Sequence, residues 1–447
     1  MAKYQKYAEY KDSGTDWLGE IPTHWDVQPT KRFFRLIAEP APENNDYELL
    51  SVYTEIGVKP RKELEQKGNK ASTTDGYWLV KKGDIVVNKL LAWMGAVGYS
   101  EYDGVTSPAY DILRPTKKLN PKFYHYLFRT KIANMEFKRW SRGIMEMRLR
   151  LYFDELGRIA MPFPTFKEQN EIVNFLDHET AKIDSLIAKQ EKLIELLKEK
   201  RQAVISHAVT KGLNPDVAMK DSGVEWLGEV PEHWILSKLK WRAVTTSGST
   251  PSTSKYELYY EDGSIPWIRT TDLNNDDLYE TPLSITPRGV SDTACSVLPV
   301  NSILIAMYGG AGSIGKHSLL KFESTINQAV CGVLPSKYFN SDYLHRFYEF
   351  YRPFWMIGAS GTRKDPNIGQ DHIKEALVPL PPLEEQVLIA NFITEMQTRY
   401  DAITQKAELA IQLMQERRTA LISSVVTGKI NVSNWQHPNE AKTEFGA

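Results

Sequence analysis

The chain has 447 residues, and at roughly 150 residues per domain this length suggests about three structural units. Hydrophobic residues make up 42% of the chain and charged residues 25%, a balance that excludes wholesale disorder. The 55 Lys and Arg residues against 56 Asp and Glu give a net charge of −1, so any basic surface for a nucleic acid must be local. Two cysteines, Cys295 and Cys331, exclude a disulfide framework and a Cys-rich zinc site.

The first thirty residues are polar and aromatic and contain no apolar stretch of the kind that a secretory signal needs. No run of apolar residues approaches the length that spans a bilayer. We therefore expect a cytoplasmic protein.

A short box near the start of the chain occurs twice. Residues 11–25 read KDSGTDWLGEIPTHW and residues 220–234 read KDSGVEWLGEVPEHW, with eleven of fifteen positions identical at an offset of 209. A second set of residues recurs at an offset of 217: Pro162, Pro164, Glu168, Gln169, Phe175, Arg201 and Thr210 reappear as Pro379, Pro381, Glu385, Gln386, Phe392, Arg418 and Thr427. The chain is thus two tandem copies of one unit.

The middle of each copy, roughly 30–160 and 240–378, shows only faint similarity to the other. In the first copy, short β-branched or aromatic runs broken by Gly, Asp and Pro predict strands within 47–58, 77–90 and 108–114, and an aromatic-rich helical stretch around 121–139. In the second copy the clearest strands are at 265–269 and 302–307, with a helix around 341–352. We predict an α+β domain in each copy, with the two diverged middles serving different targets.

The repeated C-terminal part of each copy predicts a long helix. Residues 166–211 contain no proline or glycine and follow the Met161-Pro162-Phe163-Pro164 stop signal. Read at alternating steps of four and three, they give a heptad seam: Ile172, Leu176, Glu179, Ile183, Leu186, Gln190, Leu193, Leu197, Lys200 and Val204. The second copy gives Ile389, Ile393, Met396, Tyr400, Ile403, Ala407, Ala410, Met414, Arg417 and Leu421, each 217 residues later.

A 3.5-residue repeat over five heptads favours a coiled coil over a single amphipathic helix on a globular core. A helix of about 40 residues would be about 60 Å long, more than the diameter of a compact domain. Because there are two such helices in one chain, we expect an antiparallel coiled coil. Lys200 and Arg417 would hold matching seam positions, where they either set the register or snorkel.

The predicted order is therefore two target-binding α+β domains joined by two helices. We expect a first domain with its box at 1–165, a first spacer helix at 166–213 and a second domain with its box at 214–382. A second spacer helix at 383–430 and a polar tail at 431–447 would complete the chain.

The run Gly310-Ala311-Gly312-Ser313-Ile314-Gly315 follows an apolar strand and matches the dinucleotide pattern G-x-G-x-x-G. The context of that motif is missing, because no long helix clearly follows and no acidic residue ends a second strand near position 335. Gly310–Lys316 also mimics a phosphate-binding loop, but His317 stands where a Ser or Thr should hold magnesium. We favour a glycine-rich β-loop that approaches a backbone or groove.

Motifs for catalysis do not emerge from the rest of the sequence. No Asn-Pro-Pro-aromatic or Asp-Pro-Pro-aromatic tetrapeptide is present to grip a flipped adenine, and Glu65-Gln66-Lys67 lacks an ordered aspartate partner upstream. The nine histidines are scattered, and we assign His24 and His233 of the repeated box a structural role. The sequence does not predict an enzyme.

Basic residues cluster at matching places in the two copies, beside aromatic and hydroxyl side chains. Arginine bidentate to guanine, with Ser or Thr nearby, is typical of direct base readout. A basic cluster alone is more often a solvated surface, but recurrence in two diverged domains favours DNA contact. The candidate DNA-binding residues are Lys89, Trp93, Arg139, Arg142, Arg148 and Arg150 in the first copy and Arg269, Thr270, Thr271, Tyr308, Ser313, Lys316, Arg363 and Lys364 in the second.

The paired KDSGxxWLGExPxHW boxes and the Pro-x-Pro-x-x-x-Glu-Gln entry into each long helix resemble the specificity subunit of type I restriction-modification systems. The resemblance covers about residues 10 to 430. It implies two target-recognition domains, each reading one half of a bipartite double-stranded DNA site. It also implies that the two helices act as a ruler and as the docking surface for two modification subunits.

The same resemblance places the chemistry on partner subunits. S-adenosylmethionine would belong to the modification (methyltransferase) subunits, and ATP and Mg²⁺ would belong to partner subunits that include two restriction (translocase and nuclease) subunits. This chain would then bind no cofactor. Two alternatives remain open: a duplicated binding protein for a non-nucleic-acid ligand such as a glycan, and, far below it, an enzyme that uses the glycine loop.

Overall fold

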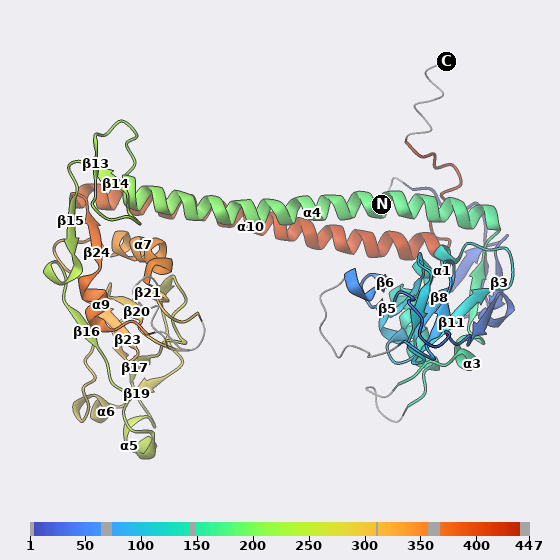
Figure 1. Ribbon diagram of the computed structural model, residues 1–447, viewed down its shortest axis with the longest axis horizontal. Coiled ribbons are helices and arrows are strands. Elements are labelled where there is room, and N and C mark those ends of the chain that lie inside the picture. Colours follow the sequence, from blue (N-terminus) through green and yellow to red (C-terminus); the bar gives the residue numbers. More distant parts are fainter. Residues whose placement is uncertain (1–3, 64–73, 144–148, 310–311, 356–366, 439–447) are drawn as a thin grey trace. The chain divides into compact units, whose positions relative to one another are not determined.

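The computed structural model describes residues 4–63, 74–143, 149–309, 312–355 and 367–438, and the chain forms two compact units. Unit 1 comprises residues 1–191 and 408–447, and unit 2 comprises residues 192–407. The long helices α4 (Phe166–Lys211) and α10 (Leu383–Val426) each contribute one half to each unit (Figure 1). Among the described residues, no helix combines the length and the apolar character that a bilayer crossing requires.

Unit 1 is built on a four-stranded antiparallel sheet in the order β4-β11-β8-β9, beside the two-stranded pairs β1–β2, β3–β12, β5–β6 and β7–β10. Its strands are β1 (Tyr10–Asp12), β2 (Glu20–Pro22), β3 (Asp26–Pro29), β4 (Phe34–Ile37), β5 (Leu50–Tyr53), β6 (Gly57–Pro60), β7 (Trp78–Val80), β8 (Ile85–Asn88), β9 (Val97–Tyr99), β10 (Gly104–Thr106), β11 (Tyr110–Pro115) and β12 (Ala160–Phe163). Its shorter helices are α1 (Pro121–Phe128), α2 (Lys131–Trp140) and α3 (Phe153–Leu156).

Both faces of β8 in the central sheet of unit 1 are buried, which explains the continuous apolar sequence of this strand. Successive side chains of a strand point to opposite faces. Ile85 and Val87 of β8 pack into the core that includes α1 and the long helices. Val86 between them packs into a second core with Leu50 and Val58 of the β5–β6 pair.

Unit 2 repeats this plan with a different sheet. Its five-stranded sheet runs β16-β23-β20-β21-β18, with β18 parallel to β21, and a separate three-stranded sheet runs β19-β17-β22. The strands are β13 (Met219–Asp221), β14 (Glu229–Pro231), β15 (Ile235–Lys238), β16 (Thr245–Ser247), β17 (Ile265–Ile268), β18 (Asp277–Leu278), β19 (Ser284–Ile285), β20 (Ile303–Ala306), β21 (His317–Leu320), β22 (Thr325–Ile326), β23 (Val330–Val333) and β24 (Leu377–Leu380). The helices are α5 (Tyr256–Tyr259), α6 (Pro287–Ser291), α7 (Ser341–Tyr351) and α9 (Gln370–Glu375).

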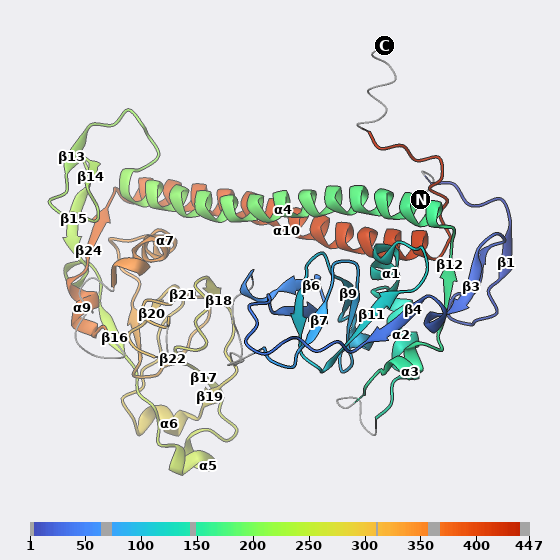
Figure 2. The same ribbon diagram turned by 45° about the vertical axis from the view of Figure 1, so that its right-hand side comes forward.

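The predicted fold class is confirmed: two tandem α+β domains accompany two long helices that pack as an antiparallel coiled coil (Figures 1 and 2). The side chains that face inward on α4 are Ile172, Leu176, Thr180, Ile183, Ile187, Gln190, Ile194, Leu197, Arg201, Val204 and Ala208. On α10 they are Ile389, Ile393, Gln397, Tyr400, Thr404, Ala407, Ile411, Met414, Arg418, Leu421 and Val425.

The predicted seam was therefore wrong at alternate positions. Two consecutive steps of four, from Ile172 through Leu176 to Thr180, shift the phase by one residue, as in a coiled-coil stutter. Leu186 and Leu193 consequently lie off the seam, with 42% and 38% of their surface exposed.

The predicted polar seam positions were also wrong. Lys200 and Arg417 are exposed, and their neighbours Arg201 and Arg418 lie on the seam instead.

Candidate nucleic-acid interface

The repeated box fixes the frame of each unit through one carboxylate. In unit 1 the box forms the β1–β2 hairpin and ends at His24 and Trp25. Trp25 Nε1 donates to Glu168 Oε1 at 2.8 Å, and His24 Nε2 lies 3.1 Å from Glu168 Oε2. Tyr7 adds a third contact, with its hydroxyl donating to Glu168 at 2.7 Å. A single acidic side chain at the start of α4 thus joins the box to the helix.

Unit 2 repeats the contacts of the box histidine and tryptophan with the helix glutamate. His233 Nε2 lies 2.8 Å from Glu385 Oε2, and Trp234 Nε1 donates to Glu385 Oε1 at 3.1 Å. The glutamine that follows each glutamate anchors the α+β domain. Gln169 and Gln386 each accept a backbone N–H, at 2.8 Å, from the N-cap residue of α1 or α7. The repeated histidines and Glu-Gln pairs therefore have the structural role that the sequence predicted for the histidines.

The structure gathers the described candidate residues of unit 1 on adjoining segments. Arg142 and Arg150 face each other across an antiparallel bridge, with both backbone hydrogen bonds at 2.9 Å. The backbone N–H of Leu151 donates to the carbonyl of Lys89 at 2.9 Å, which brings the bridge beside the turn after β8. Trp93 lies in that turn, and the Lys138 ammonium of α2 sits 5.1 Å from its ring centroid. Arg148, another candidate, lies outside the described residues.

Acidic residues form ion pairs with several of these cations, from other segments for Lys89 and Arg142 and from the same helix for Arg139. Lys89 Nζ lies 3.4 Å from Asp111 Oδ1, and burial raises the pKa of Asp111 although Lys89 opposes the shift. Arg142 pairs with Glu155 at 2.6 Å and Arg139 with Glu136 at 3.4 Å.

Arg150 differs from those cations. It approaches the Tyr152 hydroxyl at 3.5 Å and forms no ion pair with any residue that the structure describes. Of the two arginines in the bridge, Arg150 is therefore the one whose charge has no carboxylate partner among the described residues.

The candidates of unit 2 meet around the connection between β20 and β21. Arg269 follows β17 and closes a turn on Asp272, with Nη2 donating to Oδ1 at 3.1 Å and its backbone N–H to Oδ2 at 2.8 Å. A Cβ at Gly309 would lie 2.8 Å from Cβ of Ser313 and 3.6 Å from Oγ1 of Thr270, so these segments touch.

Around this turn the remaining candidates differ in their polar contacts. Thr271 donates to Asp272 at 3.3 Å. Tyr308 is partly buried beside Gly309. Lys316 forms no ion pair with the described part of the chain. Arg363 and Lys364 lie outside the described residues.

Gly310 and Ala311 lie outside the described residues, and the described part of the glycine run, 312–315, belongs to a hairpin connection and not to a nucleotide fingerprint. β20 and β21 pair antiparallel, so the run joins two neighbouring strands and does not open a helix. Gly315 adopts φ +68°, and a Cβ there would lie 2.5 Å from Trp355 Cδ1. Glycine is therefore required where the loop packs against the side chains of Trp355 and Arg352. The predicted β-loop is confirmed, and its approach to a backbone or groove stays a prediction.

Sequence reasoning missed an arginine in each unit that braces a glycine-containing turn. In unit 1 this turn lies between β8 and β9, and in unit 2 it lies between β20 and β21. Arg129 is the C-cap residue of α1, and its Nη1 donates to the carbonyls of Gly95 and Val97 at 3.0 and 3.2 Å. Arg352 is the C-cap residue of α7, and its Nη2 donates to the carbonyl of Gly312 at 2.8 Å. An arginine follows each aromatic-rich helix in the sequence, and this could have indicated the two residues. Because α7 is longer than α1, however, Arg129 and Arg352 are not related by the offset of 217 that relates the repeated helices.

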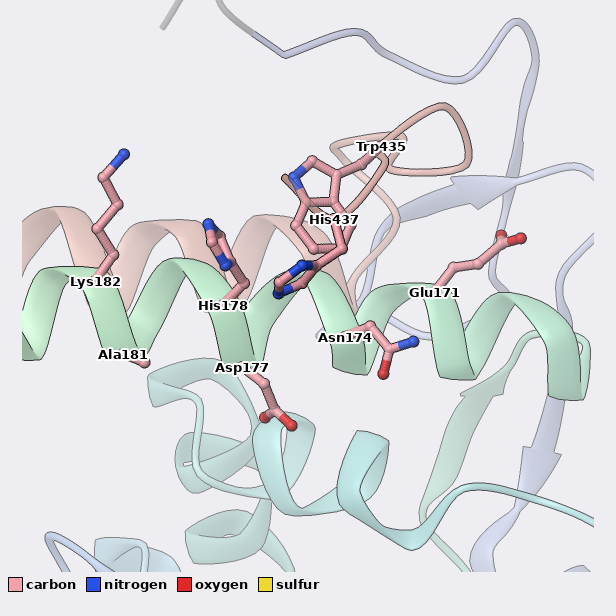
Figure 3. A pocket seen from close by; sticks show the side chains of 8 residues that line it. All are labelled: Glu171, Asn174, Asp177, His178, Ala181, Lys182, Trp435 and His437. Atoms are coloured by element: carbon pink, nitrogen blue, oxygen red, sulfur yellow. The ribbon is translucent and has the colours of Figure 1, made fainter. Parts of the chain in front are cut away.

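A hollow of about 800 Å³ lies on α4 in unit 1, where the segment after α10 packs (Figure 3). Trp435 and His437 lie there on the same side of α4 as His178, whose ring centroid is 5.0 Å from that of His437. Asp177 points the other way, toward α1, and accepts from the Tyr126 hydroxyl at 2.6 Å. Within the described ranges, no group of three or more His, Cys, Asp or Glu side chains is placed to hold a metal ion, here or elsewhere.

Two copies of one α+β scaffold, each latched to a long helix and carrying a different sheet, define a duplicated recognition protein. Residues 26–196 and 239–413 match the family model described as the type I restriction modification DNA specificity domain. The chain therefore belongs to this family, which confirms the resemblance, and its function is DNA-sequence recognition as a type I specificity subunit. Nothing in these comparisons supports the alternative of a glycan-type ligand.

Several relatives carry the same description. The chain is 24% identical to the putative type I restriction enzyme MjaX specificity subunit of Methanocaldococcus jannaschii, over 96% of this chain and 98% of the relative. It is 22% identical to the EcoBI specificity subunit of Escherichia coli, over 82% and 77%.

Two solved structures show the same fold. A chain from a structure of the type I R-M system matches with a TM-score of 0.70 and 12% identity, over 92% of this chain and 99% of that one. The HsdS subunit from Thermoanaerobacter tengcongensis matches with a TM-score of 0.59 and 13% identity, over 92% and 98%.

Proposed function

We propose that this chain is the non-catalytic subunit that selects the DNA target of a type I complex, with each unit reading one half of a bipartite site. The observation that carries the proposal is the contrast between scaffold and sheet. Glu168 and Glu385 hold the two boxes alike. The sheets they carry differ, since unit 1 has four antiparallel strands and unit 2 has five strands with one parallel pair. A constant frame with different sheets suits two readers of different sequences.

Recognition would divide between phosphate and base contacts. Lysines and arginines bound to phosphates supply most of the salt-dependent affinity, and a few side chains at base edges supply the sequence preference. The adjoining segments around Arg150 in unit 1 and around Gly309 and Lys316 in unit 2 are the proposed contact surfaces. Arginine and lysine bonded bidentately to guanine, with hydroxyl groups nearby, would read bases there.

The chemistry of methylation and cleavage is assigned to partners. Two modification subunits would supply S-adenosylmethionine and flip the target adenine. Two restriction subunits would supply ATP-driven translocation and Mg²⁺-dependent cleavage. The complex would act in the cytoplasm, where its DNA is.

A domain exchange tests the two-reader assignment. Replacing residues 240–378 with the matching region of a relative should change one half of the methylated sequence and leave the other half unchanged. The matched control replaces residues 30–160 and should change the opposite half. Methylome sequencing of a host that carries each chimera with the same partner subunits reads both outcomes. A change of both halves by a single exchange would refute the assignment.

A binding measurement tests the non-catalytic assignment. The purified chain without partners should neither bind S-adenosylmethionine nor methylate DNA. Calorimetric binding of that cofactor to the isolated chain at micromolar concentration would contradict the proposal.

A further inference from the structure

The two halves of the coiled coil carry the same interhelical ion pair. In unit 1, Arg418 of α10 donates to Asp184 of α4, with Nε to Oδ1 at 2.8 Å and Nη2 to Oδ2 at 3.3 Å. In unit 2, Arg201 of α4 lies 3.2 Å from Asp401 of α10. Each residue of one pair is 217 positions from its equivalent in the other. The two arginines are thus matched in sequence, helix position and partner.

Their surroundings differ in charge. In unit 2, Arg201 also lies 3.8 Å from Glu349 of α7, so a second carboxylate faces the arginine. Counted from the N-cap residues Asn120 and Asn340, the position of Glu349 on α7 is that of Arg129 on α1. Unit 1 therefore presents an arginine where unit 2 presents an acid.

A cavity of about 280 Å³ lies at this place in unit 1, lined by Arg129, Arg418, His125, Thr130, Thr419 and Glu55 among others. It is formed by α1 and the C-terminal half of α10, which lie beside each other in both ribbon views (Figures 1 and 2). At about 30 Å³ per water molecule, this volume holds a tetrahedral oxyanion together with several waters.

One of the two positive charges at the cavity has no carboxylate partner among the described residues. Arg129 donates to backbone carbonyls of Tyr53, Thr54 and Glu55 as well as to those of the glycine turn, but it forms no ion pair with any described residue. Burial, followed by the charge of Arg418, lowers the pKa of Arg129 to about 10. Arg129 is partly buried, and the backbone carbonyls that accept from its Nη1 and Nη2 carry no formal negative charge. A guanidinium without an ion pair beside a second guanidinium therefore favours an anion at the cavity.

The remaining groups leave room for that anion. Arg418 binds Asp184 through Nε and Nη2, so its Nη1 donors have no acceptor among the described side chains. Burial lowers the pKa of His125 to about 3, so its ring is neutral and adds no charge to the cavity. Glu55 lines the cavity, but its carboxylate makes no ion pair with either arginine in the described structure.

We propose that the cavity between Arg129 and Arg418 binds a phosphate-class oxyanion, and that unit 2 has no such site because Glu349 occupies its place. The source is either free inorganic phosphate or a phosphate of the DNA backbone. The second source rests on the proposed function, whereas the first does not.

Phosphate titration of the full-length chain tests the site. Isothermal calorimetry with inorganic phosphate should show binding that Arg418→Gln weakens by roughly tenfold or more, since a charge-assisted contact is worth about 1.5–3 kcal/mol. Arg201→Gln is the matched control: it loses the equivalent Asp401 pair but should bind phosphate like the wild type. Asp184→Asn removes the partner of Arg418 while keeping the arginine, and should retain or strengthen binding.

These variants separate a lost site from lost structure. If Arg418→Gln destabilised the helix pair, Asp184→Asn would weaken phosphate binding too, and the proposal would be overturned. Absence of phosphate binding to the wild type, or an equal loss in Arg418→Gln and Arg201→Gln, would also overturn it.

A salt titration of DNA binding identifies the source. If the oxyanion is a DNA phosphate, Arg418→Gln should lower the slope of log K against log salt by about 1, and Arg201→Gln should not. An unchanged slope together with lost phosphate binding assigns the site to the free ion. A chain that binds phosphate but no DNA would refute the proposed function and leave the oxyanion site standing.

Discussion

Trp25 donates its indole N–H to the carboxylate of Glu168 at 2.8 Å, across 143 residues of chain. The same contact joins Trp234 to Glu385 at 3.1 Å. Trp25 and Trp234 are fully buried, at 0% and 1% exposure, so neither donor can turn to solvent when its acceptor is lost. The tryptophan that ends each box is therefore repeated for a buried polar contact as well as for apolar packing.

Removing the acceptor should destabilise the two units unequally. Glu168→Ala leaves the buried donors of Trp25 and Tyr7 and the exposed His24 without a partner, and should cost unit 1 about 2–4 kcal/mol. Glu385→Ala orphans one buried donor and an exposed histidine, and should cost unit 2 about 1–2 kcal/mol. Hydrogen exchange followed by mass spectrometry measures each unit separately. Glu168→Gln, which keeps an acceptor oxygen, should lose less, and equal effects of both alanine changes would count against this account.

The free energy of unfolding should depend on pH through histidines on the equivalent helices α1 and α7 and through His317 beside α7. His125 on α1 and His345 on α7 each stand five residues after the N-cap asparagine, and His345 packs on His317 with ring centroids 5.0 Å apart. Burial, first among the causes, lowers the pKa of His125 to about 3 and of His317 to about 4, and moves that of His345 in the same direction.

Because the unfolded chain binds protons near pH 6.5 and the folded histidines do not, stability is complete above that pH and falls below it. The loss should be up to about 1.4 kcal/mol per pH unit for each histidine, down to pH 3 for His125 and pH 4 for His317. Urea unfolding at pH 7.5, 6.5 and 5.5 measures the slope. It should be steeper for unit 2, which has two such rings, and His125→Gln should flatten the slope of unit 1. A pH-independent free energy of unfolding over this range would contradict the assignment.

The sequence predicted the architecture well because its signals are local and repeated. The boxes, the Glu-Gln pairs and the absence of Pro and Gly in 166–211 each mark one element, and the equal offset of 217 marks a duplicated helix. The seam was harder to predict. Exposed Leu186 and Leu193 fit a strict heptad as well as the half-buried Ile187 and Ile194 do, so composition could not reveal the stutter at Thr180.

The proposed DNA-contact surface was harder to predict, because the charges of its candidate residues depend on ion-pair partners outside the local sequence pattern. Asp111 neutralises Lys89 and Glu155 neutralises Arg142, and neither pairing follows from the local pattern. The glycine turn shows the same limit. Its composition predicted a loop, but the arginine that braces it in each unit comes from a helix end about 35 to 40 residues away. The DNA-contact residues and the domain bounds themselves stay predictions.

The arginine at the end of α7 should position the glycine hairpin of unit 2. Arg352 donates to Asn275 Oδ1 at 3.3 Å and to the Gly312 carbonyl at 2.8 Å. Arg352→Ala removes both contacts and should cost the hairpin about 1–2 kcal/mol of local stability. Amide exchange within 312–320 should quicken while exchange in unit 1 stays unchanged. If unit 2 reads one half-site, as proposed, affinity for that half-site should fall, and Arg352→Lys should recover part of it. Unchanged exchange in this hairpin would show that Arg352 does not brace it.

The last prediction separates cations that contact DNA from cations that hold the fold. Arg150 has no ion pair among the described residues, so Arg150→Ala should change the free energy of unfolding by less than about 0.5 kcal/mol. The same change should weaken DNA binding by about 1–3 kcal/mol if the side chain reads a base, with relaxed specificity at one position. If it binds a phosphate instead, the loss should be uniform across sequences and the salt slope should fall by about 1.

Arg269 provides the contrast in unit 2. Its guanidinium donates to the Asp272 carboxylate and stabilises the turn after β17. Arg269→Ala should therefore lower the free energy of unfolding as well as weaken DNA binding. Lys316→Ala, at an unpaired cation of the same region, should behave like Arg150→Ala. Fluorescence anisotropy with matched and mismatched duplexes, together with urea unfolding of each variant, distinguishes the two groups. If Arg150→Ala and Lys316→Ala lost stability yet bound DNA normally, the unpaired cations would belong to the fold, and the paired ones would have to be reconsidered as the DNA contacts.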